Sequence, residues 1–108
     1  MEQKHCLQEA LKNIVTYPDY NIIALRSNNK YSIVIKDELD NIHDYAFHFI
    51  LTNGTYVIDT MHFSDKVKIE DYFTKYLSKN TVIDARVSEI NSGILVKLVE
   101  IFGIRRIK

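Results

Sequence analysis

The sequence has little of several residues that usually mark special structure. Among 108 residues there are one Cys, one Pro, three Gly and no Trp. A single Cys cannot form an internal disulfide, so stability must come from packing. The scarcity of Pro and Gly leaves little room for linkers or long loops. The first residues lack the apolar run of a signal peptide, and no segment approaches transmembrane length.

The net charge of the chain is zero, which argues against partners that are themselves highly charged. Lys plus Arg and Asp plus Glu both number 14, so no net field draws the chain to nucleic acid or to an anionic membrane. One Cys and scattered His lack the paired spacing of zinc ligands, and there is no Gly-rich phosphate loop. We therefore expect no metal, no cofactor, no nucleic acid and no membrane partner. The expected location is the cytoplasm.

The composition predicts one globular domain spanning residues 1–108. Hydrophobic residues make up 46% and charged residues 26%, ordinary values for a folded chain with one core. The clearest helical period predicts an amphipathic N-terminal helix that ends at Tyr17-Pro18, because the residue before Pro disfavours helix. Its apolar stripe comprises Leu7, Ala10, Leu11, Ile14 and Val15.

Short β-rich runs follow the helix. Ile22–Leu25 and Tyr31–Ile35 flank turn-prone Asn residues and predict a hairpin around residues 27–30, followed by a polar loop over residues 37–41. Two stronger strands, Asp44–Leu51 and Tyr56–Met61, are joined by Asn53-Gly54, which favours a two-residue type I′ turn.

The remaining segments predict a second helix and a further strand. Ser64-Asp65 resembles a helix cap before a stripe over Ile69–Leu77, and residues 81–90 read as a strand. Residues 94–102 fit a helix, which we favour, or a strand. The predicted class is α+β, with an N-terminal helix packed on an antiparallel sheet and a second helix after the central hairpin.

The predicted hairpin places a histidine opposite an aspartate. A two-residue turn pairs Thr52 with Thr55, and the same register sets His48 against Asp59 on one face of the sheet. By this parity His62 falls on the other face, as a structural or exposed side chain. A cross-strand His–Asp pair is often only a solvated ion pair. Under apolar cover, however, the carboxylate orients the imidazole and supports its protonated form.

Cys6 lies just before the apolar stripe of the first helix. A free Cys is commonly a small buried hydrophobe. At a helix start, however, unpaired N–H groups and the dipole favour the thiolate, and the same N–H groups could receive an oxyanion. His5 beside it reads as a surface side chain. A nucleophile at a helix start, a histidine on a strand and an aspartate on the next strand form the order that papain-type chemistry uses.

The chain resembles papain-fold cysteine hydrolases, and more closely the papain-fold toxin domains of bacterial polymorphic and contact-dependent systems. The resemblance covers roughly residues 6–77. It rests on Cys6 with Ala10 and Ile14, on the strand from His43 through His48, and on Asn53-Gly54 followed by residues 57–62. It implies a papain-like core. Either His43 or His48 could match the family histidine, since an acidic residue follows His43 whereas the hairpin register favours His48.

The resemblance implies acyl transfer on an amide: peptide cleavage, deamidation or transglutamination. Cys6 would be the nucleophile, His48 (or alternatively His43) the base, and Asp59 the residue that orients it. Gln3 is a possible oxyanion contact, although it lies very near Cys6. The partners would be a protein or peptide substrate and a cognate immunity protein. The resemblance also implies a second possible location, a target cell into which a secreted effector delivers the domain. The alternative is a non-enzymatic immunity or interaction protein, because the sequence starts with Met and stands alone, whereas toxin domains usually end longer polypeptides.

Overall fold

The fold begins with a helix and continues as a six-stranded sheet, a two-stranded sheet and a short second helix. The computed structural model describes residues 3–29, 31–84 and 105–107, with backbone only for residues 3–6 and 105–107. The elements are α1 (Gln3–Thr16), β1 (Asn21–Ser27), β2 (Ile33–Lys36), β3 (Ile42–Tyr45), β4 (Phe47–Thr52), β5 (Tyr56–Ile58), β6 (Val67–Lys68), α2 (Ile69–Asp71), the single π-helical turn η1 (Tyr72–Tyr76), β7 (Thr81–Asp84) and β8 (Arg105–Ile107).

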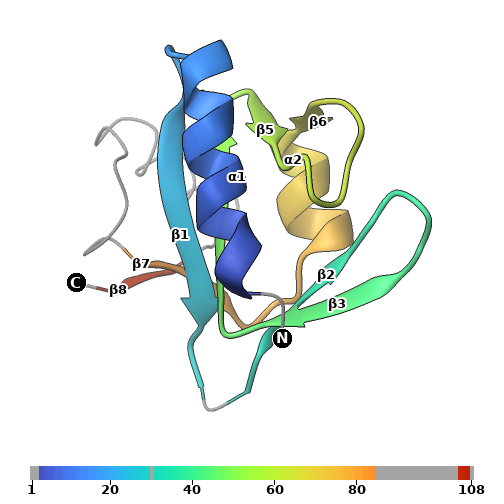
Figure 1. Cartoon of the computed structure of the whole chain (residues 1–108). Coiled ribbons are helices and arrows are strands. Elements are labelled where there is room, and N and C mark those ends of the chain that lie inside the picture. Colours follow the sequence, from blue (N-terminus) through green and yellow to red (C-terminus); the bar gives the residue numbers. More distant parts are fainter. Residues whose placement is uncertain (1–2, 30, 85–104, 108) are drawn as a thin grey trace.

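Six of these strands form one sheet in the order β6-β5-β4-β1-β7-β8. Every neighbouring pair is antiparallel except β7 and β8, which are parallel. The strands β2 and β3 form a separate two-stranded sheet that extends from the main body (Figure 1). The predicted α+β class, with an N-terminal helix on a mainly antiparallel sheet and a second short helix, is confirmed.

The strand alternation divides the interior into two layers, one on each face of the sheet. On one face, α1 contributes Ala10 to a small cluster with Ile22, Leu51 and Ile58. On the other face lies a larger core, to which α2 and η1 contribute Ile69, Tyr72 and Phe73. The sheet residues of this larger core are Ile23, Leu25, Ile50, Val57 and Ile83.

The predicted hairpin between residues 22–25 and 31–35 is wrong. β1 pairs with β4 and β7, whereas β2 pairs with β3. Because residues 22–25 are apolar throughout, β1 has both faces buried and takes a central place in the sheet. The hairpin turn lies instead at the polar loop, where the Asp37 carboxylate accepts the backbone N–H groups of Leu39 and Asn41 and where Asp40 has a φ of 66°.

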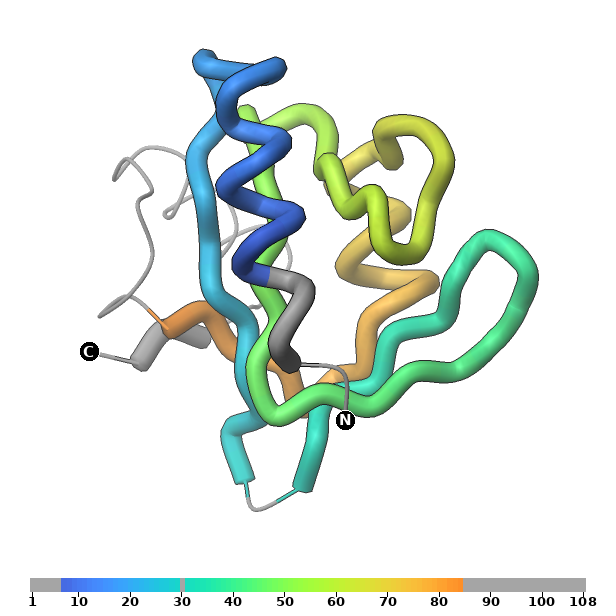
Figure 2. The backbone as a smooth tube through the Cα atoms, viewed as in Figure 1, coloured from blue at the N-terminus to red at the C-terminus, as the bar shows by residue number. Residues whose placement is uncertain are grey.

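The predicted strand Asp44–Leu51 is divided in two. A bend at Ala46 separates β3, which belongs to the small sheet, from β4, which belongs to the large one. The chain therefore leaves one sheet and enters the other just before His48. This bend brings the turn at the tip of the small sheet beside residues 62–64 (Figure 2), where Glu38 accepts two hydrogen bonds from Ser64.

The predicted register of the β4–β5 hairpin is also wrong. Thr52 pairs with Val57 and not with Thr55. A type I′ turn needs positive φ at both central residues, but only Gly54, at 90°, has it. The Asn53 side chain instead accepts the N–H groups of Thr55 and Tyr56 and so widens the loop. The resulting shift is even, so each side chain keeps its predicted face.

Replacing Gly54 by alanine is expected to lower the free energy of unfolding by about 1–2 kcal/mol, because a Cβ is strained at this positive φ. Urea unfolding followed by circular dichroism measures the change. Asn53→Asp is the matched control, since it keeps a side-chain oxygen in the position of the amide Oδ1 that accepts the loop N–H groups. Equal effects of the two substitutions would contradict this explanation of the loop.

The predicted second helix is shorter than expected. Ser64 and Asp65 do not cap it; β6 intervenes, and Lys68 precedes the first helical residue without any side-chain cap. Ser64 is instead committed to Glu38. The predicted strand over residues 81–90 is β7 as far as Asp84; its remainder and the segment 94–102 lie outside the described residues.

The first helix buries only part of its predicted stripe. Ala10 is buried and Ile14 half-buried, whereas Leu7, Leu11 and Val15 are 41%, 51% and 81% exposed. The helix ends at Thr16, as predicted from Pro18. Within the described residues, no helix has the length and apolar character needed to cross a bilayer.

Candidate functional site

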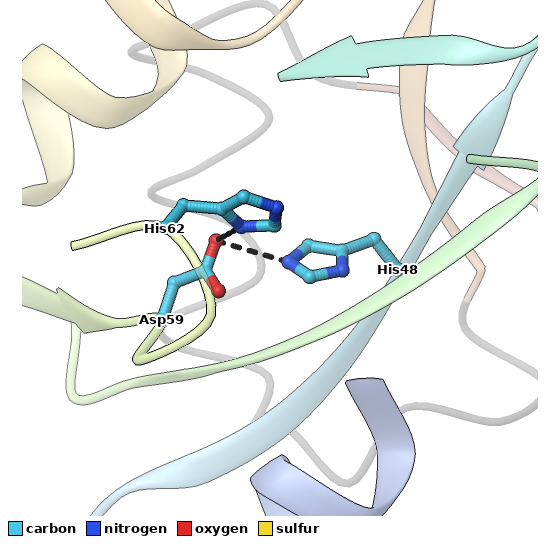
Figure 3. Close-up of side chains that lie close together, drawn as sticks. All are labelled: His48, Asp59 and His62. Carbon is cyan, nitrogen blue, oxygen red and sulfur yellow. Dashed lines mark hydrogen bonds and ion pairs between the residues drawn. The ribbon is translucent and has the colours of Figure 1, made fainter. Parts of the chain in front are cut away.

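Three polar side chains meet inside the larger core: His48, Asp59 and His62 (Figure 3). His48 is the second residue of β4, and Asp59 directly follows the last residue of β5. The Asp59 carbonyl accepts the N–H groups of His62 and Phe63, at 3.1 and 2.9 Å. This tight turn folds the His62 side chain back over Asp59. The site is thus built where β5 ends, next to the start of β4.

One oxygen of Asp59 accepts three hydrogen bonds. Nε2 of His48 lies 3.0 Å from Oδ2, Nδ1 of His62 lies 2.8 Å from it, and the Tyr72 hydroxyl lies 2.9 Å from it. An ionised carboxylate can only accept, so each of these atoms donates a hydrogen. His48 therefore carries hydrogen on Nε2, and His62 carries hydrogen on Nδ1. All four residues are buried, with exposed fractions of 4% or less.

The surroundings hold Asp59 in its ionised form. Burial by itself would raise the pKa of Asp59, but the positive charge that His48 carries when protonated and the hydrogen bonds from both histidines outweigh it, so the pKa lies below its ordinary value of 3.8. Burial, together with the adjacent Asp59 charge, raises the pKa of Tyr72 well above 10.0, which keeps its hydroxyl a donor.

A second layer of polar contacts surrounds His62. Its Nε2 lies 2.7 Å from the Tyr45 hydroxyl, and its ring is tilted against that of His43 at 4.8 Å between centroids. His43 does not bond Asp59: its Nε2 lies 2.8 Å from Asp37. The hydrogen bond from His43, with others from the loop backbone, lowers the pKa of Asp37 to about 2 against the opposing effect of burial. His43 thus belongs to the turn of the small sheet.

The helix α1 begins with Gln3, and Cys6 is its fourth residue. Backbone alone is described at Gln3, His5 and Cys6, so the expected roles of these three residues stay predictions. The apolar contacts of α1 lie on the sheet face opposite the larger core and its polar cluster. Both α1 and β4 start at the same end of the sheet, beside the β3–β4 junction (Figure 1). A nucleophile on α1 must therefore reach His48 around this end of the sheet.

Sequence reasoning missed two members of the cluster. His62 was expected on the opposite face, which is wrong because β5 ends at Ile58 and strand parity does not extend to residue 62. The spacing of three residues between Asp59 and His62, directly after a strand, is the signal that could have indicated a turn contact. Tyr72 was expected only as part of an apolar stripe, and nothing in the sequence distinguished its hydroxyl from those of the other tyrosines.

The same cluster offers a set of metal-binding atoms. Ligand atoms of His48, Asp59 and His62 lie within 4.8 Å of one another. Two imidazoles and a carboxylate could hold a transition-metal ion such as zinc. As the side chains lie, both nitrogens donate to Asp59, so an ion would have to displace two protons and the bond from Tyr72.

A hollow of about 220 Å³ opens near the same end of the sheet. Its lining includes Arg26, Tyr31 and Phe47, the last of which directly precedes His48. The Arg26 guanidinium lies over the Phe47 ring at 5.5 Å and pairs with Asp84 at 3.5 Å. The hollow therefore combines an aromatic wall with a cation at the end of the sheet where β4 starts.

Comparison with family models, with curated proteins and with solved structures gives no match to this chain.

Proposed function

We propose that this chain is a cysteine-dependent amide hydrolase or acyltransferase, with Cys6 as nucleophile, His48 as base and Asp59 as the residue that orients the base. The observation that carries the proposal is the buried hydrogen bond of 3.0 Å from His48 Nε2 to an ionised Asp59. It commits one ring nitrogen to the carboxylate and so assigns the base function to Nδ1. The nucleophile is the thiol of Cys6, and its position in the sequence near the start of α1 favours the thiolate form.

The reaction follows from these roles. Nδ1 of His48 removes the thiol proton, and the Cys6 sulfur forms a bond to the substrate carbonyl carbon. The resulting oxyanion accepts hydrogen bonds from backbone N–H groups at the start of α1, with Gln3 as a possible further donor. His48 then returns the proton to the leaving amine, which leaves a thioester. Water resolves it in cleavage or deamidation, and an amine resolves it in transamidation.

We propose a bacterial effector as the biological setting. The support is the resemblance of residues 6–77 to papain-fold toxin domains. The domain would act on a protein or peptide inside a target cell, and a cognate immunity protein would block it in the producing cell. The hollow lined by Arg26, Tyr31 and Phe47 offers a place for part of the substrate at the end of the sheet where β4 starts.

The reactivity of the single thiol tests this function. Iodoacetamide alkylation of the native protein, measured from about pH 5 to 9, should proceed well below the ordinary thiol pKa of about 8.5. His48→Ala should slow this low-pH reaction, whereas the matched control His43→Ala should not, because His43 bonds Asp37 and not Asp59. A thiol that reacts only after unfolding, or with an ordinary pKa, would rule the enzyme out. An effect of His43→Ala alone would identify that residue as the base.

One observation favours the alternative, a non-enzymatic immunity or interaction protein. Leu7, Leu11 and Val15 recur at every fourth position of α1 and are 41%, 51% and 81% exposed. Such a stripe is typical of a helix that docks on a partner. This alternative predicts an inert thiol together with a partner whose binding is weakened by Val15→Asp, and these two results separate it from the enzyme.

A further inference from the structure

We propose that His62 is a positioning residue of the site: it holds the Asp59 carboxylate from a second side and thereby fixes the tautomer of His48. The effect of His62 on catalysis rests on the proposed function. The hydrogen bonds among His48, Asp59 and His62 do not depend on it. The sequence pattern assigned His62 no such role.

The two histidines share one acceptor. His48 and His62 both donate to Oδ2 of Asp59, at 3.0 and 2.8 Å, and the His62 bond is the shorter. A carboxylate held by one donor can rotate about its side-chain bonds, whereas a second donor from another direction restricts that rotation. The Tyr72 hydroxyl, at 2.9 Å, adds a third direction. Asp59 is thus held in place even before His48 is considered.

His62 is itself held at both ring nitrogens. Nδ1 bonds Asp59, and Nε2 lies 2.7 Å from the Tyr45 hydroxyl. Its backbone N–H bonds the Asp59 carbonyl in the turn. The ring also meets the His48 ring edge-on, at 5.0 Å between centroids. A ring with these restraints has one orientation available, and this is the property that a positioning residue needs.

The hydrogen bonds to Asp59 also select the tautomer of each histidine. Because Asp59 is ionised, His62 must present hydrogen at Nδ1 and His48 must present hydrogen at Nε2. If the carboxylate turned away, the single N–H hydrogen of the neutral His48 ring could lie on either nitrogen. In the tautomer with this hydrogen on Nδ1, that nitrogen could not remove the proton of the Cys6 thiol. The contribution of His62 is therefore to exclude the unproductive tautomer.

Two matched variants, His62→Asn and His62→Gln, distinguish a positioning role of His62 from a packing role, because the two roles predict opposite orders of harm. The amide of Asn can occupy the position of Nδ1, whereas the longer Gln places its amide near Nε2. His62→Asn thus keeps a donor to Asp59 and loses volume, while His62→Gln keeps volume and the contact to Tyr45 but loses that donor. Packing alone predicts that Asn is the more harmful substitution. Positioning predicts that Gln is the more harmful one.

Two measurements decide between these roles. In ¹⁵N NMR spectra of the unaltered protein, His62 should carry its hydrogen on Nδ1 and His48 on Nε2. In His62→Gln the His48 signal should show a tautomer mixture, and low-pH alkylation of Cys6 should slow by roughly tenfold or more, as expected for loss of a charge-assisted hydrogen bond. In His62→Asn both readouts should stay close to those of the unaltered protein.

The NMR result does not depend on Cys6, so the failure of this inference is distinguishable from the failure of the proposed function. The His48 tautomer should be the same in Cys6→Ser, and it remains measurable if the thiol proves inert. Finding His62 with its hydrogen on Nε2 in the unaltered protein would overturn the proposal even if no variant folds. The proposal would equally fail if His62→Asn disturbed His48 more than His62→Gln.

Discussion

Replacing Asp59 by alanine is expected to lower the free energy of unfolding by about 3–5 kcal/mol, the range for breaking a buried charged pair. The loss arises because three buried donors, on His48, His62 and Tyr72, lose the single oxygen that accepts them. Urea unfolding at neutral pH measures the change. A loss this large could remove most of the stability of a small domain.

The control for this substitution is Asp44→Ala. Asp44 is an exposed residue of β3, so its replacement should change stability by no more than about 0.5 kcal/mol. If Asp59→Ala were as mild as Asp44→Ala, the described network would not contribute to folding. Asp59→Asn separates charge from shape, because the amide preserves volume but offers only one acceptor oxygen and adds two donors.

The second large effect is a loss of stability in acid. The pKa of Asp59 is lowered in the folded protein and that of Asp37 is lowered to about 2, against an ordinary value of 3.8. A lowered pKa means that the unfolded chain binds protons more readily than the folded one. The stabilisation from each carboxylate is therefore complete above its unfolded pKa and is lost as the pH falls through the folded pKa.

Urea unfolding at pH values from about 5 down to 2 checks this dependence, since the free energy of unfolding should fall over this range as the unfolded chain takes up protons that the folded protein does not bind. Asp37→Asn should remove the part of the slope between 3.8 and about 2. Asp59→Asn should flatten the curve further toward lower pH. A free energy that rises on acidification over this range would contradict the ionised state of both carboxylates.

The elements with strong local signals could be predicted from sequence. Three features follow from short-range chemistry: the end of α1 just before Pro18, the turn-forming loop at residues 37–41, and the shared face of His48 and Asp59. Strand pairing could not be predicted in this way. The segment 22–25 resembles half of a local hairpin, but a strand that is apolar on both faces gains most by lying between β4 and β7.

In the site, too, some residues could be placed from the sequence and others could not. Strand parity was sufficient to bring His48 toward Asp59, because an even shift in register leaves every side chain on its face. The positions of His62 and Tyr72 required the turn after β5 and the packing of η1 against the sheet. Neither contact has a periodic signal, since each depends on where separate elements dock.

By itself, the sequence determined the α+β class, the extent of the first helix toward Pro18 and the pairing of a histidine with an aspartate on one face, all of which depend on local period and turn chemistry. Only the tertiary structure decided that β1 is central, that His43 forms its hydrogen bond with Asp37, and that Asp59 accepts hydrogen bonds from two histidines and a tyrosine. The physical reason is burial: removing apolar faces from water selects among pairings that are locally equivalent, and an ionised carboxylate enters the core only where enough donors converge on it.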